Sequence, residues 1–158
     1  MEKDIIKKDE KGKILDLKNQ ASVVSYLESL QSVISRMGGN SANIKALIAV
    51  VYTIFITILI AIKELKKYWW IGLIIVFIGI LMDTYYLALE KMYRRKNNDF
   101  VDNLNNGQVD EKAIYNMNPK STYLKYELFA VMLDAVRSFS VIVFYILFIG
   151  ITILLKFI

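Results

Sequence analysis

The sequence predicts an all-α membrane protein: three transmembrane helices with cytoplasmic helical extensions, assembled as an oligomeric bundle. Apolar residues make up 56% of the 158 residues, above the roughly 45–50% of a typical globular chain. They gather in three blocks, at 46–62, 69–82 and 138–158, which charged and Asn-rich stretches separate. A chain this short cannot cover three such blocks with its own polar surface, so lipid is the expected solvent.

The composition also removes most classes of enzyme. The chain has no Cys and no His, which excludes thiolate catalysis and removes the commonest metal ligand and near-neutral base. We therefore expect no enzyme activity, no cofactor and no metal site. A membrane enzyme that uses Asp83 and Glu90 ranks last, because no nucleophile or metal cluster accompanies these carboxylates.

Charge and apolar pattern divide the chain into five segments. They are a charged N-terminal tail (1–20), an amphipathic cytoplasmic helix (21–40), a transmembrane hairpin (41–90), a cytoplasmic segment with a second amphipathic helix (91–137) and a third transmembrane helix (138–158). With three spans, the tail and the 91–137 segment share one side of the membrane. Residues 1–40, Lys45 at the membrane edge and the 91–137 segment together hold 16 of the 20 Lys and Arg residues, so the positive-inside rule places that side, and the N-terminus, in the cytoplasm.

The helix boundaries are predicted from breakers and caps. Gly38-Gly39 is expected to end the first amphipathic helix, with Asn40 or Ser41 capping the next one. This helix either packs on the protein's own cytoplasmic helices or docks a partner. The helix of the second span is expected to break within 97–107.

The last helical segment is predicted to begin at Asn118-Pro119, because Asn caps helices well and Pro suits the first helical position. With no further breaker before Gly150, this helix is expected to run straight into the third span.

The first span carries one face of small residues, which is suited either to close helix packing or to lining a pore. Its members are Ala42, Ala46, Ala49, Thr53, Thr57 and Ala61. In the second span, Asp83, Tyr86 and Glu90 share a face. An ionisable group within a span usually faces the bundle interior or a water-filled path. Asp83 is therefore expected either to pair with Lys45 or Arg94, or to join a carboxylate ring in an assembly, which would favour cations.

Two motifs flank this hairpin. The first reads Arg36-Met37-Gly38-Gly39-Asn40-Ser41, followed by Lys45, and the second reads Asp83-Thr84-Tyr85-Tyr86-Leu87, followed by Glu90 and Tyr93-Arg94. Together they resemble a family of small bacterial membrane proteins that includes the Hailong-type effectors of anti-phage defence. The resemblance covers about 36–95, and the Gly-Gly pair departs from the residues usual there.

The resemblance implies an oligomeric channel in the bacterial inner membrane, governed by a nucleotide signal that a partner nucleotidyltransferase makes. In the Hailong case the ligand is a DNA oligomer that keeps the effector inactive, and opening would depolarise the membrane. Phosphate binding requires cations, for which Arg36, Arg94, Arg95 and Lys96 are the candidates. The alternative for the run at 94–96 is an anchor that binds anionic lipid.

The leading hypothesis is thus a homo-oligomeric, pore-forming effector, with a tetramer as one candidate assembly and membrane lipids as further partners. Its expected pore and gating residues are Thr53, Thr57, Asp83, Tyr86 and Glu90. The alternative is a non-conducting membrane adaptor or regulatory subunit that docks a cytoplasmic partner.

Overall fold

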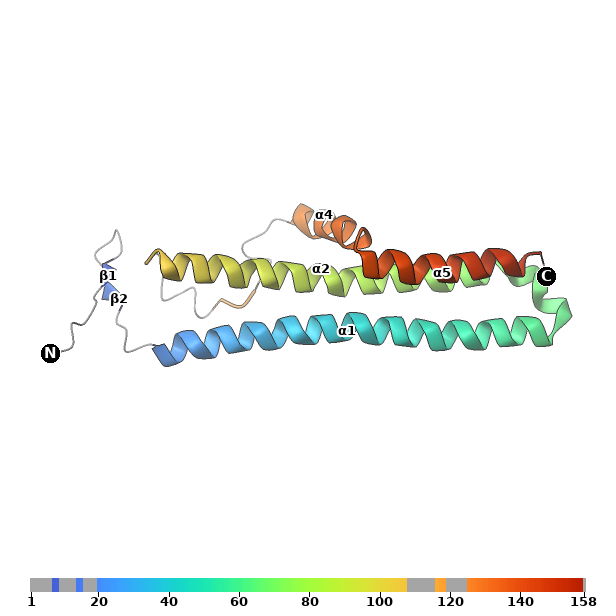
Figure 1. The fold of residues 1–158 in the computed structure, drawn as a ribbon, viewed down its shortest axis with the longest axis horizontal. Coiled ribbons are helices and arrows are strands. Elements are labelled where there is room, and N and C mark those ends of the chain that lie inside the picture. Colours follow the sequence, from blue (N-terminus) through green and yellow to red (C-terminus); the bar gives the residue numbers. More distant parts are fainter. Residues whose placement is uncertain (1–6, 9–13, 16–19, 108–115, 119–124, 158) are drawn as a thin grey trace.

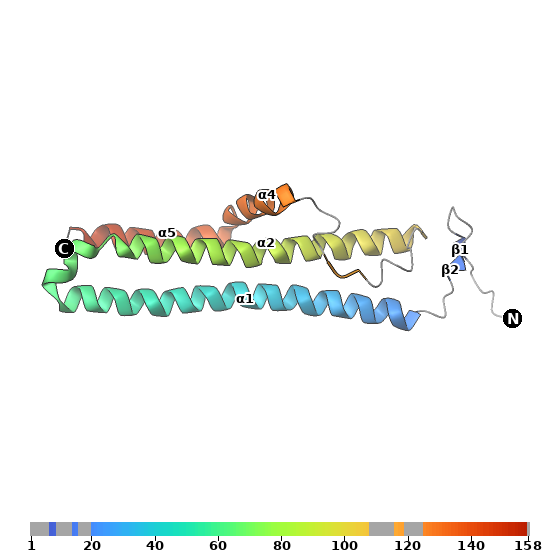
Figure 2. The same ribbon diagram turned by 180° about the vertical axis from the view of Figure 1, so that it is seen from behind.

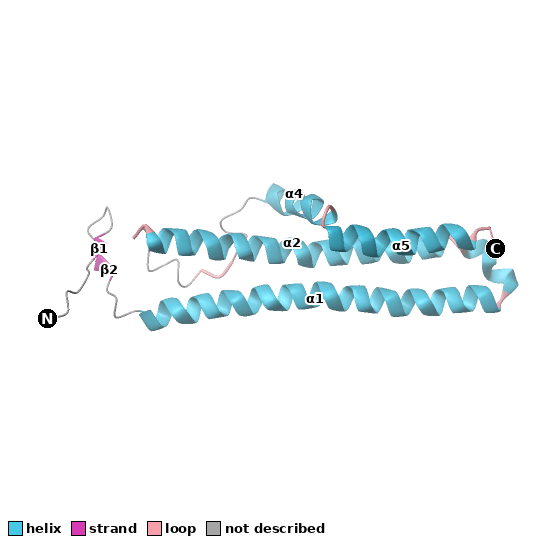
Figure 3. Cartoon of the chain, in the orientation of Figure 1, coloured by secondary structure: helices cyan, strands magenta, loops and turns pink. Residues whose placement is uncertain are grey.

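The computed structural model describes residues 7–8, 14–15, 20–107, 116–118 and 125–157. Two long antiparallel helices, α1 (Gln20–Ala61) and α2 (Ile71–Asn105), form a hairpin that sets the long axis of the molecule (Figure 1). The helix α5 (Phe139–Leu155) lies along the half of α2 next to the hairpin turn. The helix α4 (Lys125–Val136) packs on the middle of α2 and is tilted away from the axis of α5 (Figure 2). Among the described residues, non-helical regular structure is confined to the paired strands β1 (Lys7–Lys8) and β2 (Ile14–Leu15) (Figure 3).

Both hairpin helices are longer than a bilayer is thick. At about 1.5 Å per residue, α1 spans roughly 63 Å and α2 roughly 52 Å, against about 30 Å of hydrocarbon. Each is apolar enough to cross a membrane, and α4 with α5 can form a third, bent span. The prediction of a helical chain with two or three helices long and apolar enough to span a membrane is therefore confirmed.

The helical part of the molecule has two regions. The membrane half contains residues 44–61, 71–88 and 139–155, and the distal half contains residues 20–40 and 90–105. A short 3-10 helix, η2 (Lys63–Tyr68), turns the chain at the end of the membrane half.

The core of the membrane half lies between α1, α2 and α5. Its buried residues are Ile48, Tyr52, Val76, Val141, Tyr145 and Phe148. The outward faces of the same helices carry large exposed apolar side chains, among them Ile54, Phe77 and Ile146. Apolar surfaces that are exposed on three sides suit a lipid environment.

The predicted helix end at Gly38-Gly39 is wrong, because α1 runs without interruption from Gln20 to Ala61. Each glycine costs a helix roughly 1 kcal/mol relative to alanine, but packing against α2 supports the helix on both sides of the pair. Gly38 also has a packing role, since a Cβ there would lie 3.1 Å from Glu90 Oε2. The segment boundary expected at 40–41 is consequently the middle of one helix.

The helix α2 likewise continues through the Asn-rich stretch and ends near Asn105. Gly107 then adopts a left-handed φ of 70°, and its N–H donates to the Leu104 carbonyl at 3.1 Å. Glycine is the residue best suited to this conformation after a helix. The break therefore comes at the end of the predicted interval, and α2 crosses the boundary expected at 90–91.

The prediction of one continuous helix into the third span is also wrong. Ser138 is extended (φ −62°, ψ 132°) between α4 and α5, and the two helix axes bend by 63°. Serine tolerates this position because it is a favoured residue at helix N-termini. Its carbonyl accepts hydrogen bonds from Val141 N and Ile142 N, both at 3.0 Å. The predicted start at Asn118-Pro119 falls partly outside the described residues, since Pro119 is not described.

Candidate functional site

A buried ionic cluster joins α1 and α2 at the boundary between the membrane half and the distal half. Asp83 on α2 is fully buried, and Lys45 Nζ on α1 lies 2.7 Å from its Oδ2 and 2.8 Å from its Oδ1. Ser41, one turn before Lys45, donates its hydroxyl to Asp83 Oδ1 at 2.5 Å. Lys45 Nζ also donates to Ser41 Oγ at 3.1 Å. Of the two pairings expected for Asp83, the structure has the one with Lys45.

The i, i+4 spacing of Ser41 and Lys45 explains how one helix supplies both donors. Residues four apart lie on the same face of a helix, one above the other. Lys45 is 16% exposed, so its ammonium reaches the carboxylate from the edge of the core. Charges in a low-dielectric interior are stable only when they are paired and hydrogen-bonded. Asp83 Oδ1 accepts hydrogen bonds from Ser41 and Lys45, whereas Oδ2 is compensated by the charge of Lys45 alone among the described residues.

The third helix contributes a tyrosine to the same cluster. Tyr145 on α5 is buried, and its hydroxyl is close enough to Asp83 to interact with it. That hydroxyl makes no hydrogen bond of regular geometry with any described residue. Gly79, one turn before Asp83, makes the approach possible, because a Cβ there would lie 3.1 Å from the Tyr145 ring and 2.8 Å from Ile48. The glycine thus lets α1 and α5 close over the carboxylate.

A second polar link ties α1 to α5 nearer the hairpin turn. The Tyr52 hydroxyl donates to the Phe148 carbonyl at 2.9 Å and lies 2.5 Å from Thr152 Oγ1. Gly72 is the small residue here, since a Cβ would come within 2.9 Å of Phe55 and 3.0 Å of Thr152. Gly72 and Gly79 of α2 therefore lie at the two positions along the helix axis where α1, α2 and α5 come into close contact.

Glu90 and Tyr86, two of the expected gating residues, lie beyond this cluster on α2. Glu90 is largely buried and accepts from Arg94 Nε at 2.8 Å and Nη2 at 2.7 Å on one oxygen, Oε1. Tyr86 is half-buried, and its ring centroid lies 5.6 Å from that of Tyr85. Neither residue contacts the Asp83 carboxylate in any interaction the structure records among the described residues.

Thr53 and Thr57 lie on the exposed face of α1, away from the cluster. Their hydroxyls donate to the carbonyls of Ala49 and Thr53, each at 2.8 Å, so their polar atoms are satisfied by their own helix. Apart from the half-buried Ala49, the predicted small-residue face is exposed along its whole length. Among the described residues of one chain, this face therefore makes core contact only at Ala49.

The four expected ligand-binding cations differ in their exposure to solvent. Arg36, Arg94 and Arg95 are exposed on the distal half. Lys96 is only 8% exposed and donates to the Asn118 carbonyl at 2.9 Å. Burial lowers the pKa of its ammonium below the ordinary value. Three of the four candidates are thus accessible, and Lys96 instead holds the 116–118 segment on α2.

Sequence reasoning singled out Asp83 but did not predict its full setting. Lys45 and Ser41 were visible as parts of the first motif, at the spacing that puts both on one helix face. Tyr145 gave no comparable signal, because nothing local indicates which turn of α5 meets Gly79. The ion pair between Lys91 and Asp134, at 2.7 Å, was also missed, since it depends on how α4 folds back on α2.

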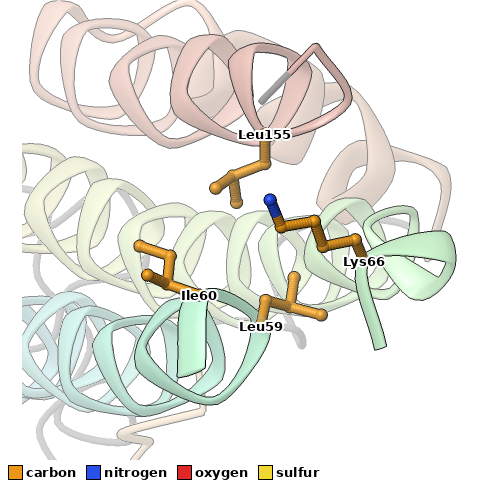
Figure 4. Close-up of a pocket in the computed structure, with 4 residues that line it drawn as sticks. All are labelled: Leu59, Ile60, Lys66 and Leu155. Carbon is orange, nitrogen blue, oxygen red and sulfur yellow. The ribbon is translucent and has the colours of Figure 1, made fainter. Parts of the chain in front are cut away.

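The chemistry available to this arrangement is limited to charge pairing and proton or ion contact. No group of three or more acidic side chains that could hold a metal occurs within the described ranges. A small pocket near the hairpin turn is lined by Leu59, Ile60, Leu155 and Lys66 (Figure 4). These side chains supply no nucleophile or acid–base pair, so the pocket does not compete with the ionic cluster as a candidate site.

Comparison with known proteins leaves the family open: no family model, curated protein or solved structure matches the chain.

Proposed function

We propose that this protein is a homo-oligomeric, pore-forming membrane effector whose opening is controlled by the Lys45–Asp83 pair inside each protomer. The observation that carries the proposal is a buried ion pair placed where two uninterrupted helices pass between the membrane half and the distal half. Ionisable residues within membrane spans commonly mark ion or proton pathways. Since α1 and α2 are continuous, a movement of their distal ends is transmitted directly to the pair.

Conduction would require several chains. The space between α1, α2 and α5 of one chain is filled by the side chains of the membrane core, so the path lies between protomers. The exposed small-residue face of α1 suits such contact, because small side chains let helix backbones approach closely. In a symmetric ring this face would repeat around the axis.

The signal is proposed to be a nucleotide or DNA oligomer that binds the distal half in the bacterial cytoplasm. The support is twofold: the two sequence motifs that resemble Hailong-type effectors, and the exposed guanidinium groups of Arg36 and Arg94. Guanidinium groups bind phosphate oxygens in a bidentate geometry. In this proposal the ligand holds the distal ends in the closed arrangement, and its loss opens the pore and depolarises the inner membrane.

Ion flux from liposomes tests the proposal. Purified protein is reconstituted in potassium-loaded vesicles, and efflux is followed with and without short single-stranded DNA oligomers. We expect efflux without DNA, suppression by DNA, and altered conductance or selectivity with Asp83→Asn. An absence of flux under every condition would reject the pore and favour the non-conducting adaptor.

Assembly is tested separately. Ala46→Phe places a large ring on the exposed small-residue face, and Ile78→Phe places the same ring on an exposed site of α2 outside it. We expect Ala46→Phe alone to reduce the oligomer seen by native mass spectrometry in detergent. Equal behaviour of the two variants would show that this face does not mediate assembly.

A further inference from the structure

The helix α4 carries apolar side chains on two separate faces. One face packs on α2: Val131 is 4% exposed, Ala135 is fully buried, and the two form one apolar cluster with the buried Ala88 and Met92. A helix that only covered α2 would carry polar residues elsewhere. Packing on α2 therefore does not account for the apolar side chains on the second face of α4.

That second face is formed by Phe129, Leu133 and Val136, which follow one another at the i, i+4, i+7 spacing of one helix face. Phe129 is 67% exposed and Leu133 is 54% exposed. The first residue of α5, Phe139, continues the apolar surface and is 81% exposed. Large apolar side chains this exposed and this close together indicate contact with lipid or protein.

The position of α4 favours lipid. The helix α5 runs alongside the membrane half of α2 (Figure 1), and α4 departs from its axis by 63° at Ser138. If α5 crosses the bilayer near its normal, α4 lies closer to the membrane plane than to that normal. A helix with an apolar and a polar face in this orientation is typical of the membrane–water interface.

The polar side chains beside the bend between α4 and α5 carry an excess of positive charge. The Asp134 carboxylate on α4 binds Lys91 Nζ on α2 at 2.7 Å, and Arg95 and Arg137 also act on it electrostatically. Lys91 and Arg95 lie one turn apart on α2, and both arginines are exposed. Three cations thus surround one carboxylate, beside an apolar surface that needs hydrocarbon.

We propose that α4 lies in the membrane–water interface, where Phe129, Leu133 and Phe139 enter the acyl region and Lys91, Arg95 and Arg137 bind the headgroup of an anionic phospholipid. Charge complementarity selects an anionic lipid over a zwitterionic one. The apolar face beside the cations can contact acyl chains, which a lipid has and a soluble phosphate compound lacks, so the site favours a lipid. This inference concerns the membrane-spanning fold alone and holds whether or not the protein conducts ions.

The depth of α4 is measured with a polarity-sensitive fluorophore. Because the chain has no cysteine, Leu133→Cys and Asn98→Cys each give a single labelling site, one on the second apolar face of α4 and one exposed on the distal half of α2. In vesicles, the label at 133 is expected to emit at shorter wavelength and to be quenched by lipids that carry spin labels on the acyl chain. The label at 98 should be quenched by a water-soluble reagent. Equal access of the water-soluble reagent to both sites would overturn the interfacial placement.

The headgroup site is tested by comparing Arg95→Gln/Arg137→Gln with Lys63→Gln/Lys67→Gln, which removes the same charge from the turn. In detergent, phosphatidylglycerol is expected to raise the melting temperature of the wild type and of the turn variant more than phosphatidylcholine does. The arginine variant should lose most of that preference, by roughly tenfold or more in relative lipid affinity. Inorganic phosphate should have no effect on any of the three.

Equal preference for phosphatidylglycerol in the two double variants would overturn the headgroup site. An inorganic phosphate effect as large as that of phosphatidylglycerol would show that the cations bind soluble anions rather than lipid, which also rejects the proposal.

Discussion

The two halves of the α1–α2 hairpin are stabilised differently. In the membrane half, α5 supplies a third helix, two glycines let the three helices meet, and the polar atoms are linked by Tyr52 and the Lys45–Asp83 pair. In the distal half, α4 packs near Met92, and farther from the membrane half the third element is the short 116–118 segment. Tyr26, Leu30 and Phe100 form its core, with Met117 packed against them.

This difference indicates where each half can change. The membrane half is held by close packing and buried polar contacts, which allow discrete arrangements rather than gradual deformation. Apart from the contacts of α4 with Lys91 and Met92, the distal half is held mainly by one small apolar cluster and by two carbonyl contacts, from Tyr26 to Asn116 and from Lys96 to Asn118. We infer that a cytoplasmic signal acts on the distal half and that the ion pair relays its effect.

Breaking the ion pair should have the largest effect on stability. Lys45→Met leaves Asp83 buried without its counter-ion and is expected to cost about 3–5 kcal/mol. The double variant Lys45→Met/Asp83→Leu should recover most of this loss, because no unpaired charge remains. Unfolding in mixed micelles measures both, with Lys63→Met as the exposed control. A Lys45→Met variant as stable as the control would show that the pair contributes nothing.

Separating the helices of the membrane half should come next. Gly79→Val forces a side chain into the space held by Ile48 and Tyr145 and is expected to cost about 1–3 kcal/mol. Gly150→Val is the matched control, because a Cβ at Gly150 meets nothing within 4 Å. Melting temperatures in detergent compare the two. Equal losses would indicate that the three helices do not meet at Gly79.

A pair of hydroxyl deletions compares the halves directly. Tyr52→Phe removes the contacts with Phe148 and Thr152 in the membrane half and should cost about 1–1.5 kcal/mol. Tyr26→Phe removes one 3.2 Å bond to Asn116 in the distal half and should cost about 0.5 kcal/mol. Chemical unfolding of both variants is the measurement. A larger loss for Tyr26→Phe would reverse the ranking of the two halves.

The adjacent glycines of α1 give the smallest effect. A Cβ at Gly39 meets nothing within 4 Å, whereas one at Gly38 meets Glu90. Gly39→Ala should therefore stabilise the protein by up to about 1 kcal/mol through helix propensity. Gly38→Ala should gain less, because Glu90 must move. A loss of stability in both variants would contradict the continuous helix and indicate a kink at this pair.

The sequence was informative where the signal is local or compositional. Apolar blocks predicted membrane-spanning helices, and the cost of a charge within a span drew attention to Asp83. It misled at Gly38-Gly39, because tertiary packing on α2 outweighs the local helix-breaking tendency. It also did not predict the bend at Ser138, because no Gly or Pro stands there and the helix is interrupted by an extended serine. Contacts such as Tyr145 with Asp83 depend on the register between helices, which no single segment encodes.

The central claim is that the buried Lys45–Asp83 pair gates conduction, and potassium flux through the Lys45→Met/Asp83→Leu variant tests it most directly. This variant keeps the packing but removes both charges. The account predicts a folded oligomer like that of the wild type, with flux lost and no further response to DNA oligomers, while Lys63→Met conducts normally. Wild-type flux and wild-type regulation in the double variant would contradict the claim.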